Sequence, residues 1–74
     1  MLKEEFEKLG RNIKYYRTQK GLSCAKLAHI LHKQERILEE IEAGKRIFQL
    51  RTLEKIANAL EVPVDKFLDF ERKD

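Results

Sequence analysis

The sequence feature that most constrains how this chain folds is a pair of signals, one for the start of a helix at Ser23 and one for the end of a later helix at Gly44. Ser23 can cap the start of a helix, because its side-chain oxygen can accept a hydrogen bond from a free backbone amide. Gly44 can end a later helix, because glycine adopts the left-handed backbone conformation at little cost. Residues 32–34 lie between these two helices. The sequence therefore predicts two short helices, at 24–31 and 35–43, joined by a tight turn.

Three further segments carry apolar residues at steps of three and four, the spacing of one helical face. The stripes are Phe6, Leu9, Ile13 and Tyr16; Leu50, Leu53, Ile56, Ala57 and Leu60; and, after Pro63, Val64, Phe67 and Leu68. We expect a first helix over about 3–20 that Gly21 ends, a fourth helix on the second stripe, and a short fifth helix that Pro63 begins. No stretch alternates with period two, so no sheet is expected. The predicted core includes Leu27, Leu38, Ile41, Leu53, Ile56 and Leu60.

The length predicts one small domain over residues 1–74, without room for a separate sensing domain, and the helical stripes predict that it is all-α. The net charge is only +3, but residues 1–31 hold seven basic and three acidic side chains. This asymmetry suits a polyanion at that end, although a solvated helical face explains the same charges and is the commoner case. The single cysteine excludes an intramolecular disulfide, and no apolar run resembles a signal peptide or a membrane span. We expect a cytoplasmic protein.

The chain offers no chemistry typical of an enzyme. It has no glycine-rich phosphate loop and no nucleophile with an evident base. His29 and His32 lack further ligands at suitable spacing, so neither a metal nor a cofactor is expected.

Several spaced motifs together resemble the phage-repressor and Cro type (Xre-like) of helix-turn-helix regulators. They are Arg17, Gly21-Leu22-Ser23, Leu27-Ala28, Ile41-Glu42-x-Gly44-Lys45-Arg46 and Thr52-Leu53-x-Lys55-Ile56-Ala57-x-Ala59-Leu60-x-Val62. The resemblance covers about residues 9–68. It implies a five-helix lambda-repressor-like DNA-binding domain, with the helix-turn-helix at about 23–43 and the third helix in the major groove of double-stranded DNA.

The resemblance also implies which side chains meet the bases. Arg36 could pair with guanine, Gln34 could reach adenine or a phosphate, and Glu35 or Glu40 could accept from the amino group of cytosine. Glu39 lies one turn further along. The acidic content of this helix departs from the Ser, Thr, Gln and Arg that are usual in the family.

Phosphate contacts are expected on both sides of the third helix. The candidates are Lys45 and Arg46 in the following loop, Lys33 in the turn, Lys26 on the second helix, and the backbone amides at the helix starts near Ser23 and Arg51. The family also pairs an arginine of the first helix with a glutamate of the third, which implies an internal ion pair between Arg17 and Glu42.

Two positions depart from the family pattern. His32 stands at a turn position that needs a positive φ, where the family usually has glycine, and histidine tolerates that conformation better than most residues. Cys24 stands where the family commonly has glutamine. It is either a small residue that fits, or a thiol whose pKa the helix N-terminus lowers, as in a redox sensor.

Two functions follow. The first is a sequence-specific transcriptional regulator of the repressor type, acting as a homodimer on a palindromic operator with half-sites about 34 Å apart. Its dimer contacts would come from Phe67, Leu68 and Phe70. The alternative is a protein-interaction module that keeps the fold but binds a partner protein through the acidic third helix and the following loop. Its apolar residues are Ile37, Ile47 and Phe48. Together with Ile30, these form either a contact surface or, with Phe48 folded inward, an altered core.

Overall fold

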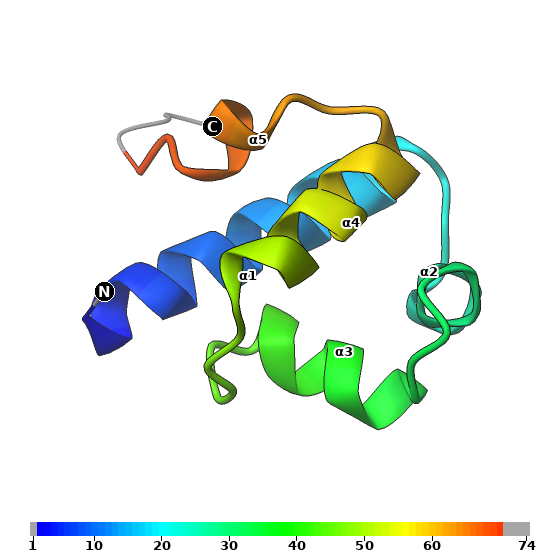
Figure 1. Ribbon diagram of the computed structural model, residues 1–74, viewed down its shortest axis with the longest axis horizontal. Coiled ribbons are helices and arrows are strands. Elements are labelled where there is room, and N and C mark those ends of the chain that lie inside the picture. The colour runs from blue at the N-terminus through cyan, green and yellow to red at the C-terminus, as the bar shows by residue number, and fades with distance from the viewer. Residues whose placement is uncertain (1, 71–74) are drawn as a thin grey trace.

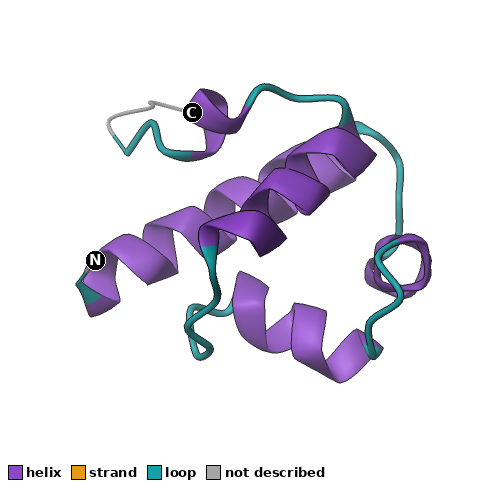
Figure 2. Ribbon diagram, viewed as in Figure 1, coloured by secondary structure: helices purple, strands orange, loops and turns teal. Residues whose placement is uncertain are grey.

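The computed structural model describes residues 2–70 of the chain. It contains five helices: α1 Lys3–Gln19, α2 Cys24–Ile30, α3 Glu35–Glu42, α4 Leu50–Leu60 and α5 Val64–Phe67. No strand occurs within these described residues, and helices and turns account for the whole arrangement (Figures 1 and 2). The expected helix order and the all-helical fold are confirmed. None of the described helices is long and apolar enough to cross a membrane.

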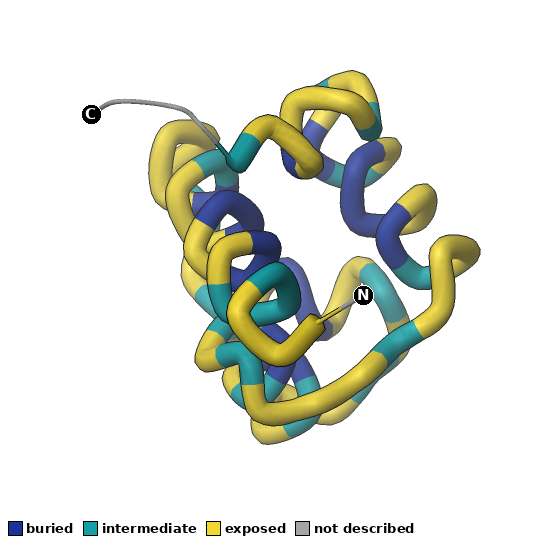
Figure 3. Tube along the Cα trace, turned by 90° about the vertical axis from the view of Figure 1, so that its left-hand side faces the viewer, coloured by how far each residue is buried: buried dark blue, intermediate teal, exposed yellow. Residues whose placement is uncertain are grey.

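Helix α1 is the central element of the fold. It contacts α3, α4 and α5, whereas α2 packs mainly against α3 (Figure 1). Along the chain trace, buried positions alternate with exposed ones in each of the longer helices (Figure 3). This is the pattern of amphipathic helices that share one core.

The core is formed by eleven buried apolar residues drawn from all five helices. They are Leu9, Ile13, Leu27, Ala28, Leu38, Ile41, Leu53, Ile56, Ala57, Leu60 and Phe67. All six residues predicted for the core are among them. Leu50 and Leu68, which their stripes placed inward, are instead 62% and 39% exposed. Both sit at a helix end, Leu50 as the first residue of α4 and Leu68 as the cap that follows α5, where the helical face turns away from the core.

Phe48 resolves one of the alternatives left open by the sequence. It packs against the core, and its ring lies 5.7 Å from that of Phe6 in an edge-to-face arrangement. Ile37 is also partly buried against the core, whereas Ile30 and Ile47 remain exposed. The four apolar residues therefore divide between an extended core and the surface.

Helix α5 is held against α1 by its backbone and by an aromatic contact. The Asn12 side-chain amide donates to the carbonyl oxygens of Phe67 (2.8 Å) and Asp69 (3.2 Å). The Phe67 ring lies 5.2 Å from that of Tyr16 and is fully buried. The expectation that Phe67 contacts a second copy is therefore wrong for its side chain, because that side chain already fills the core of one chain.

Four helices end in the same hydrogen-bonded turn. At the end of α2 the amide of His32 donates to the carbonyl of His29 (3.1 Å), and the amide of Lys33 donates to Ala28 (2.9 Å). This Schellman pattern needs a left-handed residue after the cap. Its occupants are Gly21, His32, Gly44 and Glu61, with φ of 72°, 57°, 74° and 59°. The positive φ of His32 was expected from the sequence, and that of Glu61 was not.

Gly10 sets the distance between α1 and α3. A Cβ atom at this position would lie 2.5 Å from the carbonyl oxygens of both Ile41 and Glu42. Any side chain would therefore overlap the backbone of α3, which cannot move as a flexible side chain would. The glycine allows this close approach of α1 and α3 and so determines how deeply α3 is seated.

Candidate nucleic-acid interface

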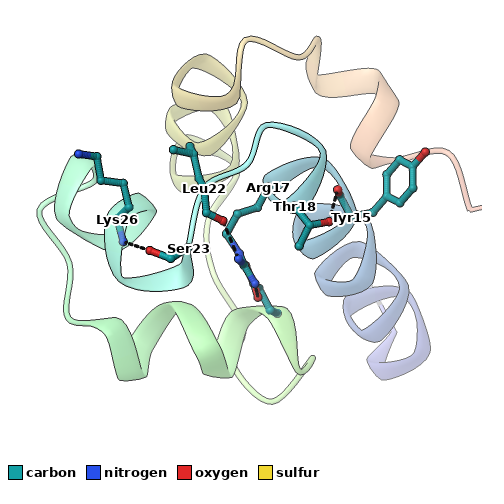
Figure 4. Close-up of polar contacts among 7 residues, drawn as sticks. Tyr15, Arg17, Thr18, Leu22, Ser23 and Lys26 are labelled. Atoms are coloured by element: carbon teal, nitrogen blue, oxygen red, sulfur yellow. Dashed lines mark hydrogen bonds and ion pairs between the residues drawn. The ribbon is translucent and has the colours of Figure 1, made fainter.

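An internal ion pair seats the C-terminal end of α3 against α1. The Nε and Nη2 atoms of Arg17 donate to the two carboxylate oxygens of Glu42 at 2.6 and 3.0 Å. The third nitrogen, Nη1, donates to the carbonyl of Leu22 at 2.8 Å, so the guanidinium also holds the segment before α2 (Figure 4). The hydrogen bond to Glu42 raises the pKa of Arg17, with burial opposing it. The two residues therefore meet as the resemblance implied.

The opposite side of α3 faces solvent. Gln34, Glu35, Arg36 and Glu39 are exposed, and Glu40 is half-buried. Leu38 and Ile41 point into the core from the same helix. Because residues four apart share a helical face, Glu35 lies next to Glu39 and Arg36 lies next to Glu40, and Gln34 is the N-cap residue at the start of the helix.

The structure shows one contact on this exposed side that the sequence did not predict, between Arg46 and Glu40. Arg46 donates to Glu40 through Nε at 2.8 Å, and its Nη2 lies 2.8 Å from the same oxygen. A residue predicted to contact bases is thus paired with one predicted to contact phosphate. Their separation of six residues spans the end of α3, so only the path of the turn at Gly44 brings them together.

The remaining predicted phosphate contacts lie at both ends of α3. Lys26, Lys45 and Arg51 are exposed, and Lys33 is half-buried in the turn. With α3 about 12 Å long, these cations flank the helix rather than gather in one patch. Such spacing suits contacts to two stretches of a DNA backbone on either side of a groove.

The two predicted backbone anion sites differ. At the start of α2 the Ser23 hydroxyl accepts a hydrogen bond from the Lys26 amide at 3.0 Å (Figure 4). At the start of α4 the N-cap is Gln49, and no side chain in the described part of the chain caps the helix. The amide of Arg51, in the first turn of α4, therefore remains available to an anion such as phosphate.

Cys24 lies beside the internal ion pair rather than in open solvent. It lines a hollow with Lys14, Arg17, Glu39 and Glu42. Burial raises the pKa of the Cys24 thiol, and the charge of Glu42 raises it further, although Arg17 opposes this. Burial and the neighbouring carboxylates therefore oppose the activated thiol that a redox sensor needs.

Comparison with known proteins identifies the arrangement. The helix-turn-helix family HTH_3 matches residues 13–67. The chain belongs to this family. Its members are DNA-binding transcriptional regulators rather than enzymes, and the fold is the lambda-repressor-like helix-turn-helix fold. No curated protein matches the chain.

Solved structures of regulators are similar over most of the chain. The restriction-modification controller protein C.AhdI from Aeromonas hydrophila is 28% identical with a TM-score of 0.82, covering 86% of this chain and 97% of that one. The clp gene regulator ClgR from Corynebacterium glutamicum is 26% identical with a TM-score of 0.83, over 86% and 68% of the two chains. SinR, the master regulator for biofilm formation, in complex with DNA, is 34% identical with a TM-score of 0.76, over 82% and 98%.

Proposed function

We propose that this chain is a sequence-specific transcriptional regulator that binds a palindromic operator as a homodimer. The observation that carries the proposal is the division of α3 into a seated side and a free side. Arg17, Glu42 and Gly10 hold the helix rigidly on the domain. The free side presents Arg36, which has a planar guanidinium suited to bidentate pairing with guanine. A rigidly held recognition helix can place that group reproducibly in a major groove.

The surrounding charges support the same function. Lys26 and Lys33 lie before α3, and Lys45 and Arg46 lie after it. In our proposal these residues and the uncapped start of α4 contact phosphates and so orient the helix. The SinR relative solved with DNA supports binding to duplex DNA by a domain of this shape.

The dimer in this proposal forms through the C-terminal region without the Phe67 side chain. Leu68, which follows α5 directly, is 39% exposed, and Phe70, two residues further on, is half-buried. A two-fold arrangement would place the two α3 helices about 34 Å apart, one turn of the duplex.

Selection of bound duplexes from a random library at low salt tests this proposal. The expected result is an enriched palindrome whose half-sites are one helical turn apart. Arg36→Ala, assayed alongside, should lose the preference at one base pair of each half-site. An enriched sequence without two-fold symmetry would overturn the homodimer, and the absence of any enrichment would overturn DNA recognition.

A second function is favoured by the apolar surface next to α3. Ile47 is 80% exposed and, with Phe6 and Ala43, lines a hollow of about 500 Å³. Together with the acidic side chains of α3, this surface suits a partner protein. The SinR relative has also been solved in complex with the SinI protein. If the random library yields no bound duplex, binding of a partner protein through this surface becomes the leading function.

A further inference from the structure

Three groups that bind metals converge where α2 meets α3. Cys24 is the first residue of α2, and Glu35 and Glu39 lie four residues apart on α3. The Cys24 sulfur and one carboxylate oxygen from each glutamate all lie within 4.8 Å of one another. The group therefore combines two kinds of ligand atom from two separate helices, which is more than an acidic surface or a single thiol offers.

The charges around this group lack a balancing cation. Among residues 2–70, the ion pairs are Arg17–Glu42, Lys20–Glu61 and Arg46–Glu40, so neither Glu35 nor Glu39 belongs to one. Like charges four residues apart on a helix destabilise it. Arg17 is committed to Glu42, and Lys14, which lines the neighbouring hollow, forms no ion pair with either glutamate.

A hollow lies beside two of the three groups. Cys24 and Glu39 line a hollow of about 280 Å³ together with Lys14, Arg17 and Glu42. The space beside the thiol and the carboxylate is thus large enough for an ion with a bound water molecule. Cys24 and Glu39 thus offer ligands from two helices at a hollow that a cation can occupy without a change of fold.

We propose that Cys24, Glu35 and Glu39 bind a divalent cation of the Zn²⁺ type, with water as the fourth ligand. A thiolate with two carboxylates selects such a cation, because Mg²⁺ and Ca²⁺ prefer oxygen ligands only. Bonds of about 2.3 Å to sulfur and about 2.0–2.2 Å to oxygen put ligand atoms roughly 3.5 Å apart around a tetrahedral ion. The ligand atoms now lie within 4.8 Å of one another, and rotation of the exposed Glu35 and Glu39 side chains brings them to the shorter separation. On binding, the thiol releases its proton to solvent and the sulfur donates its electron pair to the metal.

The site has a consequence for DNA, which rests on the proposed function. Glu35 and Glu39 lie on the side of α3 assigned to the groove, where their charges repel phosphates. A bound cation neutralises them and so strengthens binding to duplex DNA. The metal site itself does not depend on this consequence.

Titration of the full chain with Co²⁺, without DNA, tests the site. Wild-type protein should bind one Co²⁺ per chain with a thiolate-to-cobalt charge-transfer absorption, and Zn²⁺ should displace it. Cys24→Ser should abolish this absorption, and Glu39→Gln should weaken the affinity by about tenfold or more, since even residues that only support ligands contribute that much. Glu54→Gln, at an exposed position on α4, is the matched control and should bind as the wild type does.

The same titration includes a control for histidine binding. The double change His29→Gln and His32→Gln should leave the Co²⁺ absorption unchanged. The proposal is overturned if wild-type protein shows no charge-transfer absorption, or if Cys24→Ser binds as tightly as the wild type. Circular dichroism of each variant establishes that an altered affinity is not a loss of fold.

Fluorescence anisotropy with a duplex at low salt tests the consequence for DNA. Zn²⁺ should strengthen binding by wild-type protein about fivefold to tenfold, the size expected when charges beside phosphates are neutralised across water, and should not strengthen binding by Cys24→Ser. Equal binding with and without Zn²⁺ would overturn the coupling. Failure to bind any duplex, together with normal binding of Co²⁺, would overturn the proposed function and leave the metal site standing.

Discussion

The two sides of α3, a helix of eight residues, differ in how their side chains are held: those on the inner side have fixed partners, and most of those on the outer side do not. The inner side has Leu38 and Ile41 in the core and a glutamate held by two hydrogen bonds from Arg17. On the outer side, Glu35, Arg36 and Glu39 form no ion pair with any residue of 2–70, and Glu40 forms an exposed pair with Arg46. Changes on the inner side should therefore alter stability, and changes on the outer side should alter binding.

The difference shows how one short helix can contribute both to stability and to binding. Inner contacts need fixed partners, because a buried charge or a buried carbonyl is costly without one. Outer side chains need freedom to meet a ligand, so the absence of strong partners is itself a property of a binding surface. Substitutions made separately on the inner and the outer side of α3 test this division most directly.

The largest effect is expected from Glu42→Ala. The change leaves the Arg17 guanidinium poorly solvated with one hydrogen bond, to the Leu22 carbonyl, and should lower the free energy of unfolding by about 3–5 kcal/mol. Denaturant melts measure this. Glu40→Ala, which breaks the exposed pair with Arg46, is the control and should cost less than about 1 kcal/mol. Equal losses in the two variants would contradict the division of α3.

Gly10→Ala should cost about 3 kcal/mol, at the upper end of the range for overpacking. The added methyl group would overlap the carbonyl oxygens of Ile41 and Glu42, so α3 must move away from α1. Thermal melts compare it with Gly21→Ala, where the surrounding space is open and only the positive φ opposes the change, at a cost of about 1 kcal/mol. A Gly10→Ala variant as stable as Gly21→Ala would show that the close approach of the helices is not required.

Arg36→Ala should weaken binding to the preferred duplex by about 1–3 kcal/mol while leaving the melting temperature nearly unchanged. The side chain is exposed and belongs to no ion pair among the described residues, so the fold loses little with it. Anisotropy on matched specific and scrambled duplexes measures the effect. If the specific and scrambled duplexes lose affinity equally, Arg36 contacts phosphate rather than a base.

Lys45→Ala should weaken binding to every duplex to a similar and smaller extent and lower the salt slope by about one. The residue lies in the loop after α3 and is exposed, so it can reach a backbone but not the floor of a groove. A salt series with the specific and scrambled duplexes measures the slope. A loss confined to the specific duplex would refute this assignment.

The smallest effect concerns the reactivity of Cys24. Because burial and the nearby carboxylates raise the pKa of this thiol, less thiolate is present at neutral pH than in an ordinary thiol. Alkylation of the metal-free protein by iodoacetamide should therefore be slower than that of a free thiol at neutral pH, and should accelerate at a higher pH. If the alkylation rate already rises at pH values below the usual pKa range of thiols, the result would support the hypothesis of an activated cysteine.

Local signals in the sequence predicted the helices and most of the core. Apolar spacing placed Leu27, Leu38 and Leu53 inside, because periodicity alone decides which side of a helix can be buried. The same reasoning misplaced Leu50 and Leu68, since a stripe does not reveal where a helix stops packing against its neighbours. It also assigned Phe67 to a dimer, because an apolar residue near the end of a chain suits either a surface or a core.

The sequence by itself determined the helix ends at Gly21 and Gly44 and the resemblance that paired Arg17 with Glu42. These depend on residue type at a given spacing, which is visible without coordinates. The tertiary structure alone decided that Glu40 meets Arg46, that Glu61 adopts a positive φ, and that Cys24 lies beside Glu35 and Glu39. Each of these depends on how one segment is placed against another, and that placement follows from the packing of α1, α2 and α3 as a whole.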